Sequence, residues 1–153
     1  MTDLPRPAPD FTLPADDGNK ITLSTLAPAP VVLFFYPRDN TSGCTKEAVA
    51  FSHLKPEFDA LGGQVFGISK DSLASHAKFR TKQNLSIPLL SDETDTVCED
   101  YGVWQEKKMY GKTFFGIVRS TFLIDSAGQI VREWRKVKVD GHAEDVLTAM
   151  KAL

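Results

Sequence analysis

Uninterrupted apolar runs alternate with amphipathic stretches along most of the chain. Residues 31–36 are all apolar, β-branched or aromatic, and they stop at Pro37, which is typical of a strand buried on both faces. The stretch after Cys44 instead repeats its apolar residues at spacings of three and four, which predicts a helix packed on the sheet. The members of this apolar stripe are Ala48, Phe51, Leu54, Phe58 and Leu61.

The same alternation of strand and helix patterns continues toward the C-terminus. Strands are predicted at 64–69, 87–91, 120–124 and 129–137, and helices at 72–83, from about Asp92, and at 143–153. Gly128 suits the left-handed position of a hairpin turn between the last two strands. Since no linker, repeat or low-complexity segment divides the pattern, we expect residues 1–153 to form a single α/β domain with two β-α-β units.

Cys44 is expected at the point where the first buried strand passes into a helix. In a first helical turn, unpaired backbone N–H groups and the helix dipole favour negative charge, so they stabilise a thiolate. Ordinarily a lone cysteine is a small buried apolar residue. Here Thr41 adds a hydroxyl that both donates and accepts, and Pro37 adds an apolar ring without an N–H. We therefore expect a small, dry, polarised pocket around an inward-pointing thiol.

The spacing Pro37-x-x-x-Thr41-x-x-Cys44 resembles the active-site signature of the peroxiredoxins. Residues 36–47 are similar to the peroxiredoxin Q, or bacterioferritin comigratory protein, subfamily, and further segments match in the family's order as far as Asp125. These segments are residues 9–13, 67–69, 89–92, 101–104 and 119–125. The resemblance implies a thioredoxin-like fold, with a central mixed sheet flanked by helices, and a thiol peroxidase that reduces hydrogen peroxide and organic hydroperoxides.

The resemblance also implies roles for individual residues. Cys44 is the peroxidatic nucleophile, Pro37 and Thr41 shape its pocket, and Arg119 supplies a guanidinium that reaches the sulfur. When a thiolate attacks one peroxide oxygen, negative charge builds on the other, so fixed donors aimed at that oxygen stabilise the transition state. Read alone, Arg119 would be a surface cation at the start of a strand.

The second cysteine bears on how the Cys44 sulfenic acid is reduced after each turnover. Many family members carry a resolving cysteine five residues after the peroxidatic one, where this chain has Val49, and others carry it on the next helix, where the region around Arg80 has none. Cys98 remains, but nearby carboxylates disfavour its thiolate, and its position predicts a packed core residue. We therefore favour a one-cysteine cycle completed by an external thiol, such as thioredoxin, glutaredoxin or a small thiol. Resolution by Cys98, after the Cys44 helix unwinds, is the alternative.

Charge and histidine spacing limit the other functions of the chain. The chain has 18 Lys and Arg against 20 Asp and Glu, a formal net charge of −2, which gives no overall attraction to nucleic acid or anionic membranes. No apolar segment has the length of a membrane span, and the first 20 residues lack a signal-peptide pattern, so we expect a cytoplasmic protein. His53, His76 and His142 are scattered, and glycine-rich phosphate motifs are absent, so we expect neither metal nor cofactor. The resemblance implies a monomer.

Two weaker features concern residues 104–115. Lys107, Lys108 and Lys112 offer contacts to an acidic protein partner, although a solvated loop is the default interpretation. Trp104, Phe114 and Phe115 either line an apolar approach for organic hydroperoxides or belong to the core.

A redox-sensing thiol module without fast turnover is a further hypothesis for the whole chain. Such a module has no use for groups aimed at a developing oxyanion, so the set of Pro37, Thr41 and Arg119 argues against it.

Overall fold

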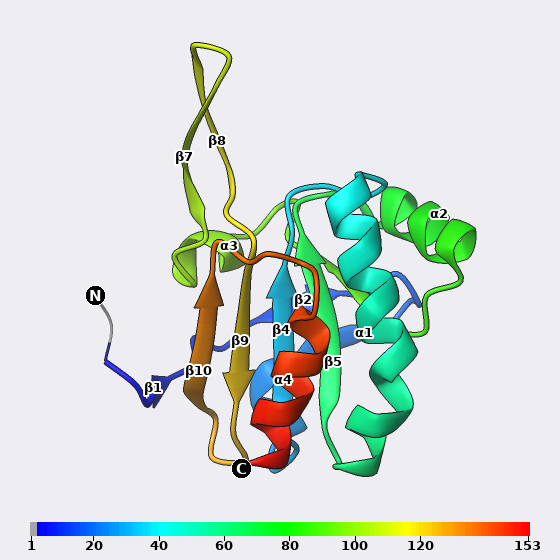
Figure 1. The fold of residues 1–153 in the computed structure, drawn as a ribbon, viewed down its shortest axis with the longest axis vertical. Coiled ribbons are helices and arrows are strands. Elements are labelled where there is room, and N and C mark those ends of the chain that lie inside the picture. Colours follow the sequence, from blue (N-terminus) through cyan, green and yellow to red (C-terminus); the bar gives the residue numbers. More distant parts are fainter. Residues whose placement is uncertain (1–2) are drawn as a thin grey trace.

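A computed structural model describes residues 3–153 and is built around a six-stranded mixed sheet (Figure 1). The strand order is β1-β10-β9-β4-β5-β6. At one side of the sheet, β4, β5 and β6 run parallel to one another, and β9 lies antiparallel to β4. The sheet strands are β1 (Arg6–Pro7), β4 (Val31–Phe35), β5 (Gln64–Ser69), β6 (Leu89–Ser91), β9 (Ser120–Ile124) and β10 (Gln129–Arg135).

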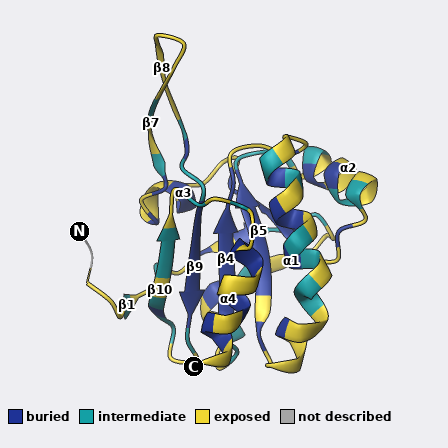
Figure 2. Cartoon of the chain, in the orientation of Figure 1, coloured by how far each residue is buried: buried dark blue, intermediate teal, exposed yellow. Residues whose placement is uncertain are grey.

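Apolar residues of β4 alternate between the two faces of the sheet, and each face has its own core. Leu33 and Phe35 belong to one buried cluster, whereas Phe34 and Tyr36, the residue after the strand, belong to the other. The second cluster is covered by α1 (Ser42–Ala60), α2 (Leu73–Gln83) and α4 (His142–Lys151), and α1 and α4 cross in front of the sheet in Figure 1. The first is covered by α3 (Val97–Asp100) and by a small sheet of β2 (Thr12–Pro14) and β3 (Lys20–Thr22). Figure 2 shows the central strands buried and the outer sides of the helices exposed.

The predicted β-α-β units are confirmed. β5 has the predicted bounds, and α2 begins after Ser72, whose hydroxyl accepts a hydrogen bond from the Ser75 N–H. It ends at Asn84 in the left-handed conformation, with φ of 53°. Two details of the helices are corrected: Leu61 lies past the end of α1 and is 38% exposed, and the helix expected near Asp92 begins at Val97. Asp92 precedes that helix and accepts hydrogen bonds from its first N–H groups, which explains why the sequence pattern indicates a helix start at Asp92.

The solvated loop expected around the lysines is wrong, because these residues form a β-hairpin. Strands β7 (Trp104–Met109) and β8 (Lys112–Ile117) pair only with each other and project away from the main sheet (Figure 1). Tyr110 and Gly111 make the turn with φ of 53° and 75°, the positive values that a tight hairpin turn requires. Most hairpin side chains are exposed on both faces, so the alternating pattern that reveals a half-buried strand is missing.

Within residues 3–153, no helix combines the length and the apolar character needed to cross a membrane.

Candidate active site

The register between β4 and β9 brings Arg119 to Cys44. Phe35, at the end of β4, lies opposite Ser120, at the start of antiparallel β9, so Arg119 stands just beyond the edge of the sheet where the chain leaves β4. The chain then passes through residues 37–41 and enters α1 at Ser42, which places Cys44 in the first turn of the helix. Residues separated by 75 positions therefore meet at one end of the sheet.

A single guanidinium joins the thiol to a buried carboxylate. Arg119 Nη2 donates to Cys44 Sγ at 3.2 Å, and Nη1 donates to Glu47 Oε1 at 2.7 Å. Cys44 and Glu47 are each only 1% exposed, and they lie one helical turn apart on the same side of α1. A Cβ at Gly43 would stand 3.1 Å from Arg119 Nη2, so the glycine leaves room for the guanidinium. The inward orientation predicted for the thiol is confirmed.

Burial shifts the pKa values of the charged groups that contact one another here. It raises the pKa of Glu47 to about 7, with Arg119 acting in the opposite direction. Burial also opposes the charge of Arg119, but Glu47 and Cys44 outweigh it and raise the pKa of the guanidinium above its usual value. Among the described residues, Glu47 Oε2 has no hydrogen-bond partner, although it is buried. The Arg119 guanidinium therefore lies between Cys44 and Glu47, and each of them stabilises its positive charge.

Pro37 and Thr41, in the segment that leads to Cys44, lie at the surface and line an open hollow, whereas the Cys44 thiol is buried next to it and is not part of the lining. Its volume is about 490 Å³, within the usual range of about 300–1,000 Å³ for ligand sites. The expectation of a small, dry pocket is therefore wrong, because both residues are exposed and the Thr41 hydroxyl donates to the Arg38 carbonyl at 3.0 Å. Trp104 and Phe114 form an apolar wall of the hollow on the hairpin side.

Trp104 packs, partly buried, against the cluster of Leu33 and Phe35, but the two phenylalanines of the hairpin are not core residues. Phe114 and Phe115 are 42% and 59% exposed, and both line the hollow. Lys107 also lines it, and burial followed by the charge of Arg119 lowers the pKa of this lysine. The hollow thus offers apolar and cationic surface close to the Arg119 guanidinium.

Cys98 lies on the other face of the sheet. It belongs to the cluster of Leu33 and Phe35, whereas Cys44 belongs to the cluster of Phe34 and Tyr36. Both cysteines are free thiols. Burial and the adjacent Asp92 carboxylate raise the pKa of Cys98 far above its usual value, and the Cys98 side chain has no exposed surface. The prediction of a packed core residue is confirmed.

Asp39, Asp71 and His76 bring one potential metal-ligand atom each to within 4.8 Å of one another. The ring nitrogens of His76 and the carboxylate oxygens of Asp39 already face protein partners, including Tyr36 and the Leu90 carbonyl. We therefore assign these groups to a hydrogen-bonded network and not to a metal centre.

The other two histidines differ in burial. His53 is exposed on α1, and His142 is buried on α4 within hydrogen-bond distance of the Thr121 hydroxyl, 2.8 Å away.

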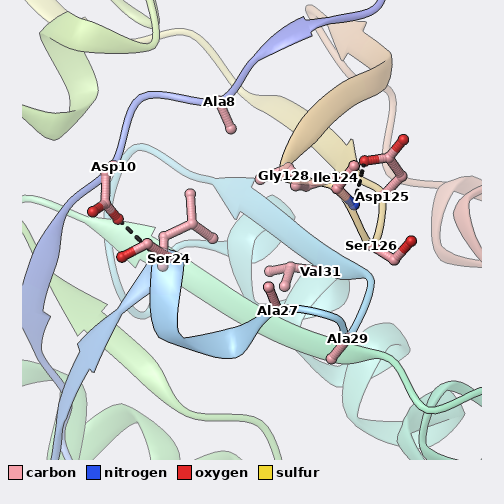
Figure 3. A pocket seen from close by; sticks show the side chains of 12 residues that line it. Ala8, Asp10, Ser24, Ala27, Ala29, Val31, Ile124, Asp125, Ser126 and Gly128 are labelled. Atoms are coloured by element: carbon pink, nitrogen blue, oxygen red, sulfur yellow. Dashed lines mark hydrogen bonds between the residues drawn. The ribbon is translucent and has the colours of Figure 1, made fainter.

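A second hollow, of about 250 Å³, opens at the opposite end of β4 (Figure 3). It lies where Val31 begins the strand and Ile124 ends β9, so the length of the sheet separates it from Cys44. Its two carboxylates are already hydrogen-bonded: Asp10 accepts from the N–H of Ser24, 14 residues further along the chain, and Asp125 accepts from backbone N–H groups of its own hairpin. We assign it no part in the thiol chemistry.

Sequence reasoning missed Glu47, Asp39 and the β7–β8 hairpin as parts of this region. For Glu47 a signal exists, since it lies three residues after Cys44 and so shares its helix face. For Asp39 no local pattern exists, because its main partner, His76, is 37 residues away.

A buried thiol at a helix start, paired with a guanidinium at the edge of a mixed α/β sheet, defines a thiol peroxidase site of the peroxiredoxin class. The AhpC/TSA family model matches residues 4–133. Peroxiredoxin Bcp of Xanthomonas campestris is 48% identical over 99% of this chain and 98% of its own length, and peroxiredoxin Bcp of Bacillus subtilis is 44% identical over 94% and 92%.

Solved structures agree with this assignment. The bacterioferritin comigratory protein of Xanthomonas campestris, studied for alkyl peroxide reduction, superimposes with a TM-score of 0.88 at 46% identity, covering 93% of this chain and 90% of that one. A cysteine-to-serine mutant of Xylella fastidiosa PrxQ gives a TM-score of 0.90 at 39% identity, covering 99% and 98%. The chain belongs to the AhpC/TSA family and, within it, to the peroxiredoxin Q, or bacterioferritin comigratory protein, subfamily with its thioredoxin-like fold.

Proposed function

We propose that the chain reduces hydrogen peroxide and organic hydroperoxides through a one-cysteine cycle at Cys44. The thiolate attacks one oxygen of the peroxide, a sulfur–oxygen bond forms, and the oxygen–oxygen bond breaks. The departing oxygen takes up a proton and leaves as water or an alcohol, and Cys44 becomes a sulfenic acid. Arg119 and the backbone N–H of Cys44 stabilise the charge that develops on the departing oxygen, and the Thr41 hydroxyl joins them when it turns away from the Arg38 carbonyl.

In the second half of the cycle, an external thiol attacks the sulfenic sulfur. A mixed disulfide forms and water leaves, and a second thiol then releases the reduced Cys44. Thioredoxin, glutaredoxin or a small thiol would each serve as this reductant.

The observation that carries the one-cysteine cycle is the division of the two thiols between the faces of the sheet. Cys44 packs with residues of β4 that point one way, and Cys98 packs with those that point the other way. A disulfide needs Cα atoms within about 7 Å, so a bond between them would require displacement of buried structure. The raised pKa of Cys98 also argues against it as the attacking nucleophile.

Organic hydroperoxides fit the hollow beside Cys44. Phe114 and Phe115 give it an apolar wall, and its volume exceeds what hydrogen peroxide needs. The relative from Xanthomonas campestris, studied for alkyl peroxide reduction, supports the same substrate class.

We also propose that residues 1–153 form one domain, because β1, near the N-terminus, pairs with β10, near the C-terminus. The monomeric state and the cytoplasmic location stay predictions.

The test is the intact mass of reduced protein after one equivalent of hydrogen peroxide, with and without a sulfenate trap. We expect a trapped adduct at Cys44 and unchanged turnover with an external thiol in Cys98→Ser. A rapid loss of two hydrogens without an adduct, abolished in Cys98→Ser, would instead establish Cys98 as the resolving residue.

A further inference from the structure

A buried polar network lies beneath the loop that leads from β4 to Cys44. At its centre is Asp39, only 5% exposed, which accepts from the Tyr36 hydroxyl at 2.7 Å and from the Ser75 hydroxyl at 2.8 Å. Its second oxygen also lies 2.8 Å from His76 Nδ1. His76 is on α2 and is completely buried. The loop that presents Pro37 and Thr41 is therefore tied to a neighbouring helix.

The contacts of His76 favour its protonated form. Its Nε2 lies 2.9 Å from the Leu90 carbonyl, which only accepts, and its Nδ1 faces a carboxylate that already accepts from two hydroxyls. Both ring nitrogens can donate only when the ring is protonated, so these contacts favour an imidazolium paired with an Asp39 carboxylate. Burial opposes the charge of His76, but Asp39 outweighs it and raises the pKa of the imidazole, whereas His76 and Tyr36 lower the pKa of Asp39 despite burial.

The backbone of the same loop is held by a second carboxylate. The Asp39 N–H donates to Asp71 Oδ2 at 2.8 Å, and the Ser69 hydroxyl donates to the same oxygen at 2.7 Å. Asp71 lies two residues after the end of β5, so the loop is anchored both to the sheet and to α2.

This anchoring matters because Cys44 is 1% exposed. A peroxide is small, but an external thiol that attacks the sulfenic sulfur must approach it in line with the bond to the leaving oxygen. The loop and the first turn of α1 must therefore move before the thiol reaches the sulfur.

We propose that the Asp39–His76 ion pair, supported by Tyr36, is a clamp that sets how often the Cys44 loop opens and so how fast an external thiol reduces the sulfenic acid. Tyr36 and His76 are positioning residues in this proposal. The effect of this clamp on the reduction of the sulfenic acid rests on the one-cysteine cycle proposed above. Its effect on loop opening rests only on the hydrogen-bonded network.

The clamp depends on pH in a definite direction. The titratable groups that face His76 are Asp39 and Tyr36 from the β4 end and Asp71 from the loop after β5, and β6 presents only the Leu90 carbonyl. The pKa of His76 is higher in the folded protein than in the unfolded chain, where it is about 6.5. The stabilisation of the closed loop by protonated His76 is therefore complete below about pH 6.5. It is lost as the pH rises through the folded value, so opening increases with pH.

The test compares Tyr36→Phe with Tyr101→Phe, both in a Cys98→Ser background. Tyr101 is also a buried tyrosine with a hydroxyl bond, to the Pro9 carbonyl at 2.8 Å, but it lies on the other face of the sheet. Hydrogen exchange at the amides of residues 42–48 reports loop opening. Formation of the mixed disulfide between the Cys44 sulfenic acid and reduced glutathione, followed by intact mass, reports access.

We expect both rates to rise about tenfold in Tyr36→Phe, as expected for one lost hydrogen bond to a charged group, and to stay within twofold in Tyr101→Phe. The rate of Cys44 oxidation by hydrogen peroxide should change little, since the closed loop still predominates. Ser75→Ala, a milder and partly exposed change in the same network, should shift both rates in the same direction if Tyr36→Phe does not fold. His76→Gln should remove the rise of opening with pH.

Equal behaviour of Tyr36→Phe and Tyr101→Phe would overturn the clamp. So would faster exchange without faster reduction of the sulfenic acid. Failure of the one-cysteine cycle would appear separately, as a Cys44–Cys98 disulfide in protein that retains Cys98.

Discussion

Replacing Arg119 by methionine separates the chemical role of the guanidinium from its structural role. The change removes a donor at 3.2 Å from Cys44 Sγ and leaves Glu47 buried without its 2.7 Å partner. A hydrogen bond to a charged group contributes about 1.5–3 kcal/mol, and loss of one oxyanion donor costs about 10²–10³ in rate. We therefore expect the second-order rate constant for hydrogen peroxide to fall at least about a hundredfold.

The effect on stability should differ from the effect on rate. A buried ion pair that loses one partner destabilises a protein by about 3–5 kcal/mol. Glu47 relieves part of this cost by binding a proton, since burial already raises its pKa to about 7. We therefore expect a smaller loss, about 2 kcal/mol at pH 8. In the double variant Arg119→Met with Glu47→Gln no buried carboxylate remains beside Cys44, so stability should recover while the rate does not.

The assays are stopped-flow oxidation of Cys44 and urea unfolding, with Arg132→Met as the control. Arg132 is exposed on β10 and stacks over Trp134, away from the thiol, so its replacement should change neither measurement appreciably. If Arg119→Met kept its rate within threefold of the unmodified chain, or if the double variant regained the rate, the assignment of Arg119 to transition-state stabilisation would be refuted.

Three further predictions follow from the same region and from the core. Thr41→Val should lower the rate constant for hydrogen peroxide about a hundredfold in stopped-flow oxidation; a rate equal to that of the unmodified chain would favour the sensor hypothesis. Phe115→Ala should lower kcat/KM for cumene hydroperoxide about tenfold but leave that for hydrogen peroxide unchanged, since only the larger substrate reaches the apolar wall; equal losses would contradict this. Burial lowers the pKa of His142 to about 4, so the unfolded chain binds its proton first; relative to His142→Gln, which keeps the opposite contribution of Glu47, stability to urea should fall by about 2–3 kcal/mol between pH 6.5 and 4, and an unchanged difference would contradict this.

Much of the sheet and helix order could be predicted because local signals agreed with the global fold. The unbroken apolar run before Pro37, the cap at Ser72 and the left-handed position at Asn84 each act over a few residues. The β7–β8 hairpin could not be predicted in the same way. Neither of its faces packs on a core, so its side chains carry no alternation, and Phe114 and Phe115 read as core residues when they are exposed.

Those residues of the site that belong to one contiguous motif could be predicted. Residues that meet only through ion pairs or hydrogen bonds between distant segments could not. Pro37, Thr41 and Cys44 lie within eight residues, and the resemblance supplied Arg119. For Glu47, whose carboxylate pairs with Arg119, the only signal was its position three residues after Cys44 on the same helix face. Similarly, the open shape of the hollow depends on where the hairpin stands, which no segment near Cys44 encodes.

The side chains of β4 point alternately to the two faces of the sheet, and this determines from which face a resolving cysteine could reach Cys44. Even-numbered residues of β4 face the cluster that contains Cys44, and α1 and α2 cover that same cluster. The two places where other family members carry a resolving cysteine, at Val49 on α1 and near Arg80 on α2, are therefore both on the side of the sheet where Cys44 lies. Cys98 is on the opposite side. The residues that occupy α1 and α2 therefore support the one-cysteine cycle that we propose, and Cys98 packs in the other core.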